Sequence, residues 1–290
     1  MRLPVIYSDL DGTLLDHHTY DPSPALPTLA ALRQRRIPVI PCTSKTREEL
    51  RPISLELKLD GPLIVENGAA VWVPEDWGLD KPKDATEEGK YWCHVFGISR
   101  ADIRQRLAFL DAEWSNRYRS LCDLSVNQVV SLTGLDKTAA SLAKERLHCE
   151  ALVWLGTSTD RELFAKQVES MDMRCIQGGR FIHVLASGGK SEAFTWLHKK
   201  IISELQVDAV SIAVGDAKND ADMLEVADFA LLVRSPVHEP PELQRQNGLV
   251  ISDHIGPVGW ADGIRTLIEK IEKETTGGRF LSKWHDHNAA

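Results

Sequence analysis

The chain opens with Leu3-Pro4-Val5-Ile6-Tyr7-Ser8-Asp9-Leu10-Asp11-Gly12-Thr13, an apolar run that leads directly into two aspartates. The run predicts a buried strand over residues 3–8. The two carboxylates face the same side of an extended chain, where their repulsion raises a pKa or requires a cation. The pair therefore predicts a divalent-metal site suited to phosphoryl transfer, with one carboxylate as nucleophile and the other handling protons.

The overall composition limits the possible partners. The chain has 290 residues, enough for one large domain or two, and 43% of them are hydrophobic, as in a globular protein. A formal net charge of −8 gives no support to nucleic acid or an anionic membrane as a partner. The same charge means that a phosphorylated ligand needs local cations or helix N-termini to bind.

The five cysteines are scattered, odd in number and never spaced as CxxC, which predicts reduced thiols. No apolar run approaches the roughly 18 residues of a membrane span. The N-terminus shows no signal-peptide pattern. We therefore expect a cytoplasmic location and no membrane partner, and nothing in the sequence indicates an oligomeric state.

Strand and helix patterns alternate at the two ends of the chain, which is typical of a parallel α/β sheet. Ser23 is expected to cap the first helix. Further strands are expected at residues 37–42, 63–65, 210–214 and 230–233, with a return strand at 69–73 after the turn 66–68. Helices are expected at residues 24–32, 46–57, 191–205, 220–226 and 257–274.

The middle of the chain has a different pattern. Residues 74–90 have the glycines, prolines and charges of a linker. After it, strands are expected at residues 91–96, 151–155, 174–177 and 181–185, and helices after Ser99, after Ser125, and at 136–147 and 159–170. This block predicts an independent α+β insert at residues 84–187, between core segments 1–83 and 188–290.

Three further signals stand at predicted strand–helix junctions, where parallel α/β sheets bind ligands. They are Cys42-Thr43-Ser44-Lys45, Gly188-Gly189-Lys190-Ser191, and Gly215-Asp216-Ala217-Lys218-Asn219-Asp220. A hydroxyl and backbone N–H groups at the first could hold a phosphate, the lysine of the second could neutralise it, and Asp216 could bind Mg²⁺.

Each signal also has a simpler explanation. A serine after a strand is often only a helix cap, and Lys190 could be a solvated lysine in a glycine-rich turn. A nucleotide-binding loop is excluded, because Val184 stands where that motif needs glycine. The Asn219-Asp220 pair could cap a helix. The coincidence of all the signals at such junctions favours one site.

In this order the motifs resemble those of the haloacid dehalogenase superfamily, Cof-like subgroup. The resemblance implies a Rossmann-like parallel-sheet core with an inserted α+β cap, and Mg²⁺ as cofactor. It implies catalytic roles for Asp9, Asp11, Ser44 and Lys190. It implies metal binding by Asp9, Asp11, Asp216 and Asp220.

Longer stretches are similar to the mannosyl-3-phosphoglycerate phosphatase family. They are residues 16–20, 44–47, 64–70, 132–135, 143–146 and 178–181. The similarity implies hydrolysis of a small phosphorylated sugar acid, mannosyl-3-phosphoglycerate. Glucosyl-3-phosphoglycerate, another phosphosugar, a phosphomutase reaction and a non-catalytic phospho-ligand sensor are alternatives. Ser191-Glu192 and Cys42-Thr43 depart from the usual family residues and leave the preferred phosphosugar open.

Substrate contacts are expected from both parts of the chain. The candidates are Thr13, Thr43, Lys45, Glu66, Asn67, Arg146, Gly178, Gly179, Arg180 and Asn219. Arg180 is the first candidate for the substrate carboxylate, because a guanidinium matches a carboxylate bidentately. Arg146 is the second, although a solvated position on the helix expected at 136–147 explains it equally well. Glu66 and Asn67 are expected to line the cleft or to serve only the hairpin turn.

Overall fold

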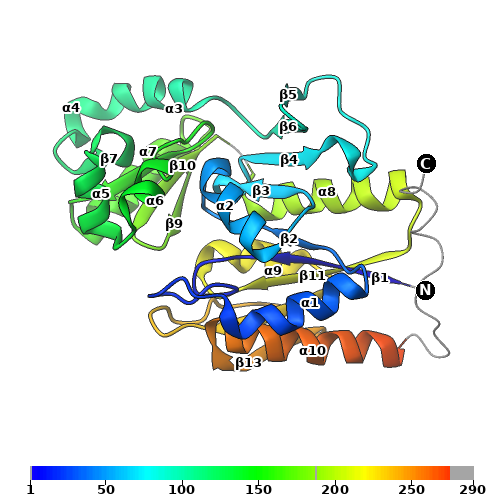
Figure 1. Ribbon diagram of the computed structural model, residues 1–290. Helices are drawn as coiled ribbons and strands as arrows, with labels where there is room; N and C mark the ends of the chain where they lie inside the picture. The colour runs from blue at the N-terminus through cyan, green and yellow to red at the C-terminus, as the bar shows by residue number, and fades with distance from the viewer. Residues whose placement is uncertain (1, 187, 275–290) are drawn as a thin grey trace.

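The computed structural model describes residues 2–186 and 188–274. At its centre is a five-stranded parallel sheet in the order β13-β12-β11-β1-β2 (Figure 1). The strands are β1 (Leu3–Ser8), β2 (Val39–Pro41), β11 (Ala209–Gly215), β12 (Phe229–Arg234) and β13 (Leu249–Ile255). The α/β prediction for the two ends of the chain is thereby confirmed, although β13 was not predicted.

Helices pack on both faces of this sheet. On one face Ile6 of β1 joins a core cluster with α1 (Leu26–Gln34), α2 (Arg47–Leu57) and α10 (Gly256–Glu274). On the other face Tyr7 packs edge-on against Phe194 of α8 (Lys190–Leu205), with ring centroids 4.5 Å apart. Helix α9 (Ala221–Val226) joins that second cluster. Among the described residues, no helix has the length and apolar character needed to span a membrane.

Two expectations near the N-terminus are wrong. Ser23 does not cap α1, because its hydroxyl donates to Asp21 and it lies in a 3-10 turn (Ser23–Ala25) before the helix. Strand β2 is shorter than predicted. Proline cannot donate to a ladder, so Pro38 and Pro41 limit the pairing to three residues.

A second, antiparallel sheet flanks the core in the order β3-β4-β6-β5. Its strands are β3 (Leu63–Val65), β4 (Ala70–Pro74), β6 (Tyr91–Val95) and β5 (Thr86–Glu88). Strand β3 is therefore not a full member of the parallel sheet, which it meets through one bridge between Cys42 and Ile64. The segment expected as a linker contains β5 and a 3-10 turn (Glu75–Trp77).

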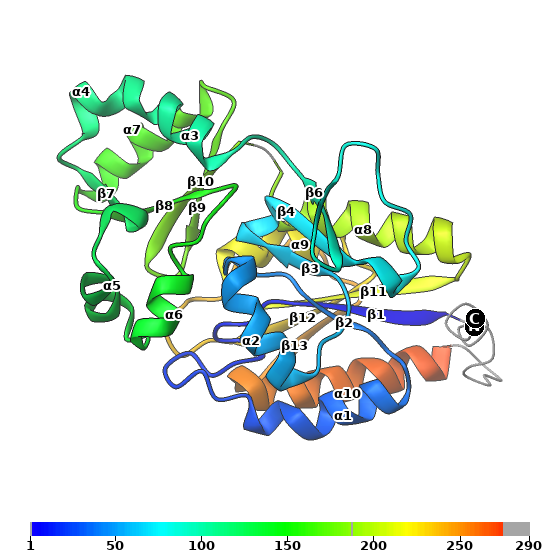
Figure 2. The same cartoon turned by 45° about the horizontal axis from the view of Figure 1, so that its top comes forward.

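The inserted unit has a third sheet, antiparallel, in the order β7-β8-β10-β9. Its strands are β7 (Tyr118–Ser120), β8 (Glu150–Trp154), β10 (Phe181–Leu185) and β9 (Arg174–Gly178). Helices α3 (Arg100–Leu107), α4 (Asp111–Trp114) and α7 (Ser158–Glu169) lie to one side, and α5 (Val126–Thr133) and α6 (Lys137–Leu142) to the other (Figure 2).

The strand pairing bears on where this unit begins. Strand β6 was expected in the insert, yet it pairs with β4, and Trp92 and Cys93 lie in the core clusters. Ser99 then caps α3 as predicted. The division of the chain into core and cap stays a proposal, and the pairing of β6 favours a boundary after residue 96 rather than at 84.

Candidate active site

Loops at the carboxyl ends of adjacent strands build the site. Asp9 follows β1, the loop of Thr43 and Ser44 follows β2, and Asp216 follows β11. Gly12 lets two of these loops meet: its φ is +79°, and a Cβ there would lie 2.7 Å from Oδ2 of Asp216. The predicted convergence of these motifs at one sheet edge is thus present in the structure.

Three buried carboxylates form the centre of the site. Asp9, Asp216 and Asp220 each place an oxygen within 4.8 Å of the others. Burial raises the pKa of Asp9 well above its ordinary value, even though Lys190 opposes this. Burial and then repulsion from Asp220 raise the pKa of Asp216 to about 7. Both pKa shifts arise first from the burial of the carboxylates and then from repulsion between them.

The cluster has unused oxygen atoms that suit a hard cation. The Thr13 hydroxyl donates to Oδ1 of Asp216 (3.1 Å). Oδ2 of Asp216 is buried and has no hydrogen-bond partner. The nearby hydroxyl of Ser235 lowers the pKa of the Asp216 carboxyl group as a whole. Oδ1 of Asp11 is also buried and without a partner. Carboxylate oxygens in this arrangement fit Mg²⁺, which prefers oxygen ligands.

Lys190 begins α8 and joins two of the carboxylates. Its Nζ lies 2.6 Å from Oδ1 of Asp9 and 2.6 Å from Oδ1 of Asp220. Burial alone would lower the pKa of Lys190, but Asp220 and Asp9 raise it above its ordinary value. Oδ2 of Asp220 accepts the backbone N–H groups of Asp216 and Ala217, each at 3.1 Å. Lys190 is therefore buried and fully charged, and the explanation as a solvated lysine is wrong.

The loop after β2 holds a second lysine. Lys45 Nζ lies 2.8 Å from Oδ2 of Asp11 and 5.1 Å from the centre of the Tyr20 ring. Thr46, rather than Ser44, caps α2, because its side chain accepts from the N–H of Glu49. The helix-cap explanation of Ser44 is therefore wrong.

A cavity between the core and the inserted unit collects many of the predicted residues. Asp9, Asp11, Ser44, Lys45, Asp216 and Asn219 line it from the core, and Arg146, Gly178, Gly179 and Arg180 from the inserted unit. The other predicted residues are buried and do not line the cavity, but each forms a hydrogen bond with a residue of the lining or with a neighbour of one. They are Thr13, Thr43, Glu66, Asn67, Lys190 and Asp220.

Comparison with known proteins places the chain in a family. Residues 6–86 match the model of the haloacid dehalogenase-like hydrolases. A curated relative from Methanococcoides burtonii, a glucosyl-3-phosphoglycerate/mannosyl-3-phosphoglycerate phosphatase, is 36% identical over 271 residues, covering 92% of this chain and 97% of the relative. The chain belongs to the haloacid dehalogenase-like hydrolases.

Solved structures have the same fold as this hydrolase. Protein 0175 of Thermoplasma acidophilum has a TM-score of 0.62 at 16% identity, covering 94% of this chain and 99% of its own. The sucrose-phosphatase of Synechocystis, solved with sucrose and phosphate, has a TM-score of 0.62 at 14% identity, covering 92% and 99%. The predicted fold class, a parallel-sheet core with an inserted α+β unit, is confirmed.

In this hydrolase, the helix-face alternative for Arg146 and the cleft-lining prediction for Glu66 are both wrong. Arg146 is not on a helix face, because α6 ends at Leu142; its side chain is buried and its NH1 donates to the carbonyl of Ser44 (3.1 Å). Glu66 does not line the cleft, since backbone N–H groups occupy both of its carboxylate oxygens. Asn67 instead accepts the amide of Asn219 at 3.3 Å.

Sequence reasoning assigned no role to several residues of the cavity wall. They include His17, Tyr20, Glu49, Thr133, Leu135, His183 and His238. Four of these stand in stretches already singled out, 16–20 and 132–135, so a signal existed. No sequence pattern pointed to His238, because it lies in an irregular segment. The fold brings it to His17, and their ring centroids are 5.7 Å apart.

Proposed function

We propose that this hydrolase is a Mg²⁺-dependent phosphatase that converts mannosyl-3-phosphoglycerate to mannosylglycerate and phosphate. The observation that carries the proposal is a buried nucleophile beside a buried cation: Asp9 bound by Lys190, next to the unpartnered Oδ2 of Asp216. The name of the curated relative supports the phosphosugar class. The choice of the mannosyl over the glucosyl ester rests on the resemblance described above.

Asp9 and Asp216, with the adjacent Asp11, would hold the metal. When bound, Mg²⁺ would offset the charge of these carboxylates and of the incoming phosphate. Asp220 was also expected to be a ligand. Its oxygens are already bound by Lys190 and by two backbone N–H groups, so we propose that it positions Lys190 instead.

In the proposed first step, a carboxylate oxygen of Asp9 attacks phosphorus. The bond from phosphorus to the sugar-acid oxygen breaks, and protonated Asp11 gives its proton to that oxygen. Lys190 holds Oδ1 of Asp9, which leaves Oδ2 to attack. The products are an aspartyl-phosphate on Asp9 and the free mannosylglycerate.

In the second step, water attacks the aspartyl-phosphate. Asp11 takes a proton from that water, and the bond between phosphorus and Asp9 breaks to release inorganic phosphate. Ser44 and Lys45 lie at the cavity wall, where they could bind oxygens that are not transferred. The net reaction is ester plus water to alcohol plus phosphate, and both aspartates return to their starting states.

The inserted unit would recognise the sugar acid. Arg180 is exposed and lines the cavity, and only its NH1 has a hydrogen bond in the described structure, to the carbonyl of Leu132 (2.6 Å). Its remaining N–H groups can bind a carboxylate. Gly178 and Gly179 beside it allow a ligand to approach the backbone.

Phosphate release tests this function. Purified protein would be given mannosyl-3-phosphoglycerate, glucosyl-3-phosphoglycerate and other sugar phosphates, with Mg²⁺ or with a chelator. We expect stoichiometric phosphate from the mannosyl ester, lost on chelation. Consumption of substrate without free phosphate would instead indicate a mutase. Binding of phosphorylated ligands with no turnover of any ester would indicate a sensor.

A further inference from the structure

We infer that Glu66 is a positioning residue that ties the inserted unit to the loop after β2 (residues 42–45) and thereby places Arg146 at the site. The residue sits in the 3-10 turn Glu66–Gly68 that joins β3 to β4, and its side chain is buried. The kinetic part of the inference rests on the proposed function, whereas the structural part does not.

The carboxylate of Glu66 binds three consecutive backbone N–H groups of the inserted unit. Oε1 accepts from Leu147 at 3.0 Å, and Oε2 accepts from His148 at 3.0 Å and from Cys149 at 2.8 Å. Successive N–H groups that converge on one anion form a strong binding arrangement, and hydrogen bonds to a charged acceptor exceed neutral ones. Segment 147–149 is therefore held to the core by one side chain.

The backbone of the same turn holds the loop after β2. The N–H of Glu66 donates to the carbonyl of Lys45, and the N–H of Asn67 donates to the carbonyl of Thr43, both at 2.9 Å. Both turn residues have positive φ, 51° and 59°. A left-handed backbone at two residues that are not glycine is strained, and the bonds on both sides stabilise it.

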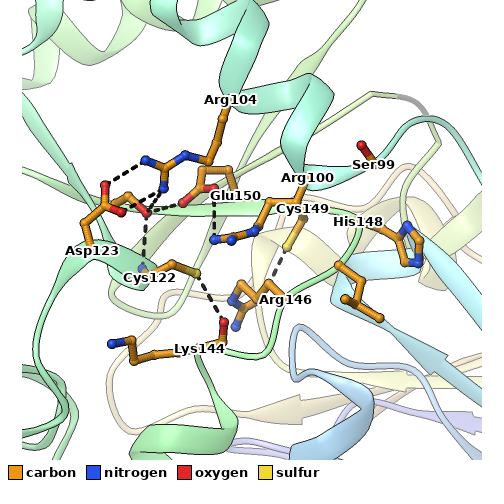
Figure 3. A network of polar contacts seen from close by, with 12 residues as sticks. Ser99, Arg100, Arg104, Cys122, Asp123, Lys144, Arg146, His148, Cys149 and Glu150 are labelled. Carbon is orange, nitrogen blue, oxygen red and sulfur yellow. Dashed lines mark hydrogen bonds and ion pairs between the residues drawn. The ribbon is translucent and has the colours of Figure 1, made fainter.

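Arg146 directly precedes the tied segment. Its NH1 donates to the carbonyl of Ser44 at 3.1 Å. It also donates to Sγ of Cys149 at 3.2 Å (Figure 3). Its Nε is buried without a hydrogen bond, and the side chain lines the cavity. Arg146 thus has an unused donor beside the loop after β2. The position of Arg146 depends on segment 147–149, which Glu66 holds.

The first connection into the inserted unit is tied to the same segment. The N–H of Arg100, at the start of α3, donates to the carbonyl of Leu147 at 2.7 Å. The first connection into the inserted unit therefore meets segment 147–149 at the residues that Glu66 binds. Another link between the two parts, from the Thr46 hydroxyl to the carbonyl of Leu142 (3.0 Å), lies outside this junction.

The test is Glu66→Gln, measured by amide hydrogen exchange and by kinetics. Glutamine keeps the size but offers one acceptor oxygen, and its NH₂ faces N–H groups that need acceptors. We expect exchange at amides 147–149 to rise about 10- to 100-fold in the ligand-free protein. We expect kcat/KM for mannosyl-3-phosphoglycerate to fall about 10- to 100-fold. Turnover of p-nitrophenyl phosphate, which has no sugar acid to align, should change little.

Glu150→Gln is the matched control. Glu150 is equally buried and adjacent in sequence to the tied segment, but it faces Ser120 and Arg100 within the inserted unit (Figure 3). Its substitution should leave the ratio of the two activities at the wild-type value. A change in that ratio equal to the one in Glu66→Gln would overturn a specific role for Glu66.

Unchanged exchange at residues 147–149 in folded Glu66→Gln would also contradict the inference, as would equal loss of both activities. If Glu66→Gln does not fold, Glu66→Asp takes its place. Aspartate keeps the charge and tolerates positive φ, so it should show a smaller rise in exchange. If wild-type protein does not turn over the phosphosugar, the proposed function fails, and the exchange measurement still decides whether Glu66 holds the junction.

Discussion

At the residue scale, the proposed chemistry depends on which lysine binds which aspartate. Lys190 bridges Asp9 and Asp220, and Lys45 binds Asp11, so each lysine approaches a different member of the proposed catalytic pair. This separation supports the different proposed roles of Asp9 and Asp11. It also leaves Asp216 without a cationic side chain as a direct partner in the described structure, and this is where we propose that the metal binds.

Gly12→Ala tests the close approach of two loops. The substitution adds a Cβ at φ +79° and places it 2.7 Å from Oδ2 of Asp216. We expect phosphatase activity to fall at least about 100-fold, because a displacement near 1 Å can cost that much. Gly89→Ala is the control: its φ is +65° with no atom within 4 Å, so only backbone strain of about 1 kcal/mol should appear. Activity measurements and urea unfolding compare the two, and equal effects would show that crowding at Asp216 does not matter.

Individual residues were predictable where chemistry and position agreed. Asp9 and Asp216 each follow an expected parallel strand, so the strand-end rule places them together. Lys190 begins an expected helix, and only the fold brings it to Asp9. Glu66 was expected either to line the cleft or to serve only the hairpin turn. Neither alternative included its contact with the inserted unit, because a sequence does not show which backbone N–H groups a carboxylate meets. Those groups lie at 147–149, about 80 residues away along the chain.

At the element scale, apolar runs predicted most of the strands and missed β5, β7 and β13, which all lie at sheet edges. Strand β1 is buried along most of its length, so its sequence is uniformly apolar. Strand β13 is mostly exposed and contains Ser-Asp-His before its last residue, and β7 has only three residues, so neither has the pattern of a buried strand. The pairing of β6 with β4 depends on tertiary contacts, which a linear pattern does not contain.

The acidic strand ends predict a dependence of stability on pH. The pKa of Asp216 is about 7 in the folded protein, above the ordinary value of 3.8. The folded state therefore binds more protons than the unfolded state between these values, and its stability falls as pH rises through that window. Metal-free protein should thus melt at a lower temperature at pH 8 than at pH 5.

Added Mg²⁺ should raise the melting temperature more at pH 8, where the carboxylates are ionised. Scanning calorimetry at both pH values, with and without Mg²⁺, measures these effects. Asp216→Asn should flatten the pH dependence. A wild-type melting temperature that rises from pH 5 to pH 8 in the absence of metal would contradict the assignment.

At the scale of the whole molecule, the core would supply the reaction and the inserted unit the selectivity. The cavity lies between them, with carboxylates and lysine on one wall and arginines and glycines on the other. Sequence similarity indicated which segments contribute, but the closure of the cavity depends on contacts such as that between Arg146 and Ser44.

Arg180→Met tests whether the inserted unit recognises the substrate while the core performs the reaction. Loss of the guanidinium should raise KM for the phosphosugar about tenfold, in line with a charged hydrogen bond worth about 1.5–3 kcal/mol. Turnover of p-nitrophenyl phosphate should be nearly unchanged. Arg161→Met is the control, since Arg161 bonds Gln177 in the same unit and is not part of the cavity lining. Steady-state kinetics on both substrates measure the effect, and a matching rise in KM for Arg161→Met would remove Arg180 from the substrate site.

The most direct test of the account is whether a phosphoryl group forms on Asp9. Protein mixed with mannosyl-3-phosphoglycerate and Mg²⁺ would be quenched with acid within one turnover, digested and analysed by mass spectrometry. The account predicts one phosphoryl group on the peptide that contains Asp9, with none in Asp9→Asn, which should also release no phosphate. Normal phosphate release by Asp9→Asn, or a phosphoryl group found only on another residue, would contradict it.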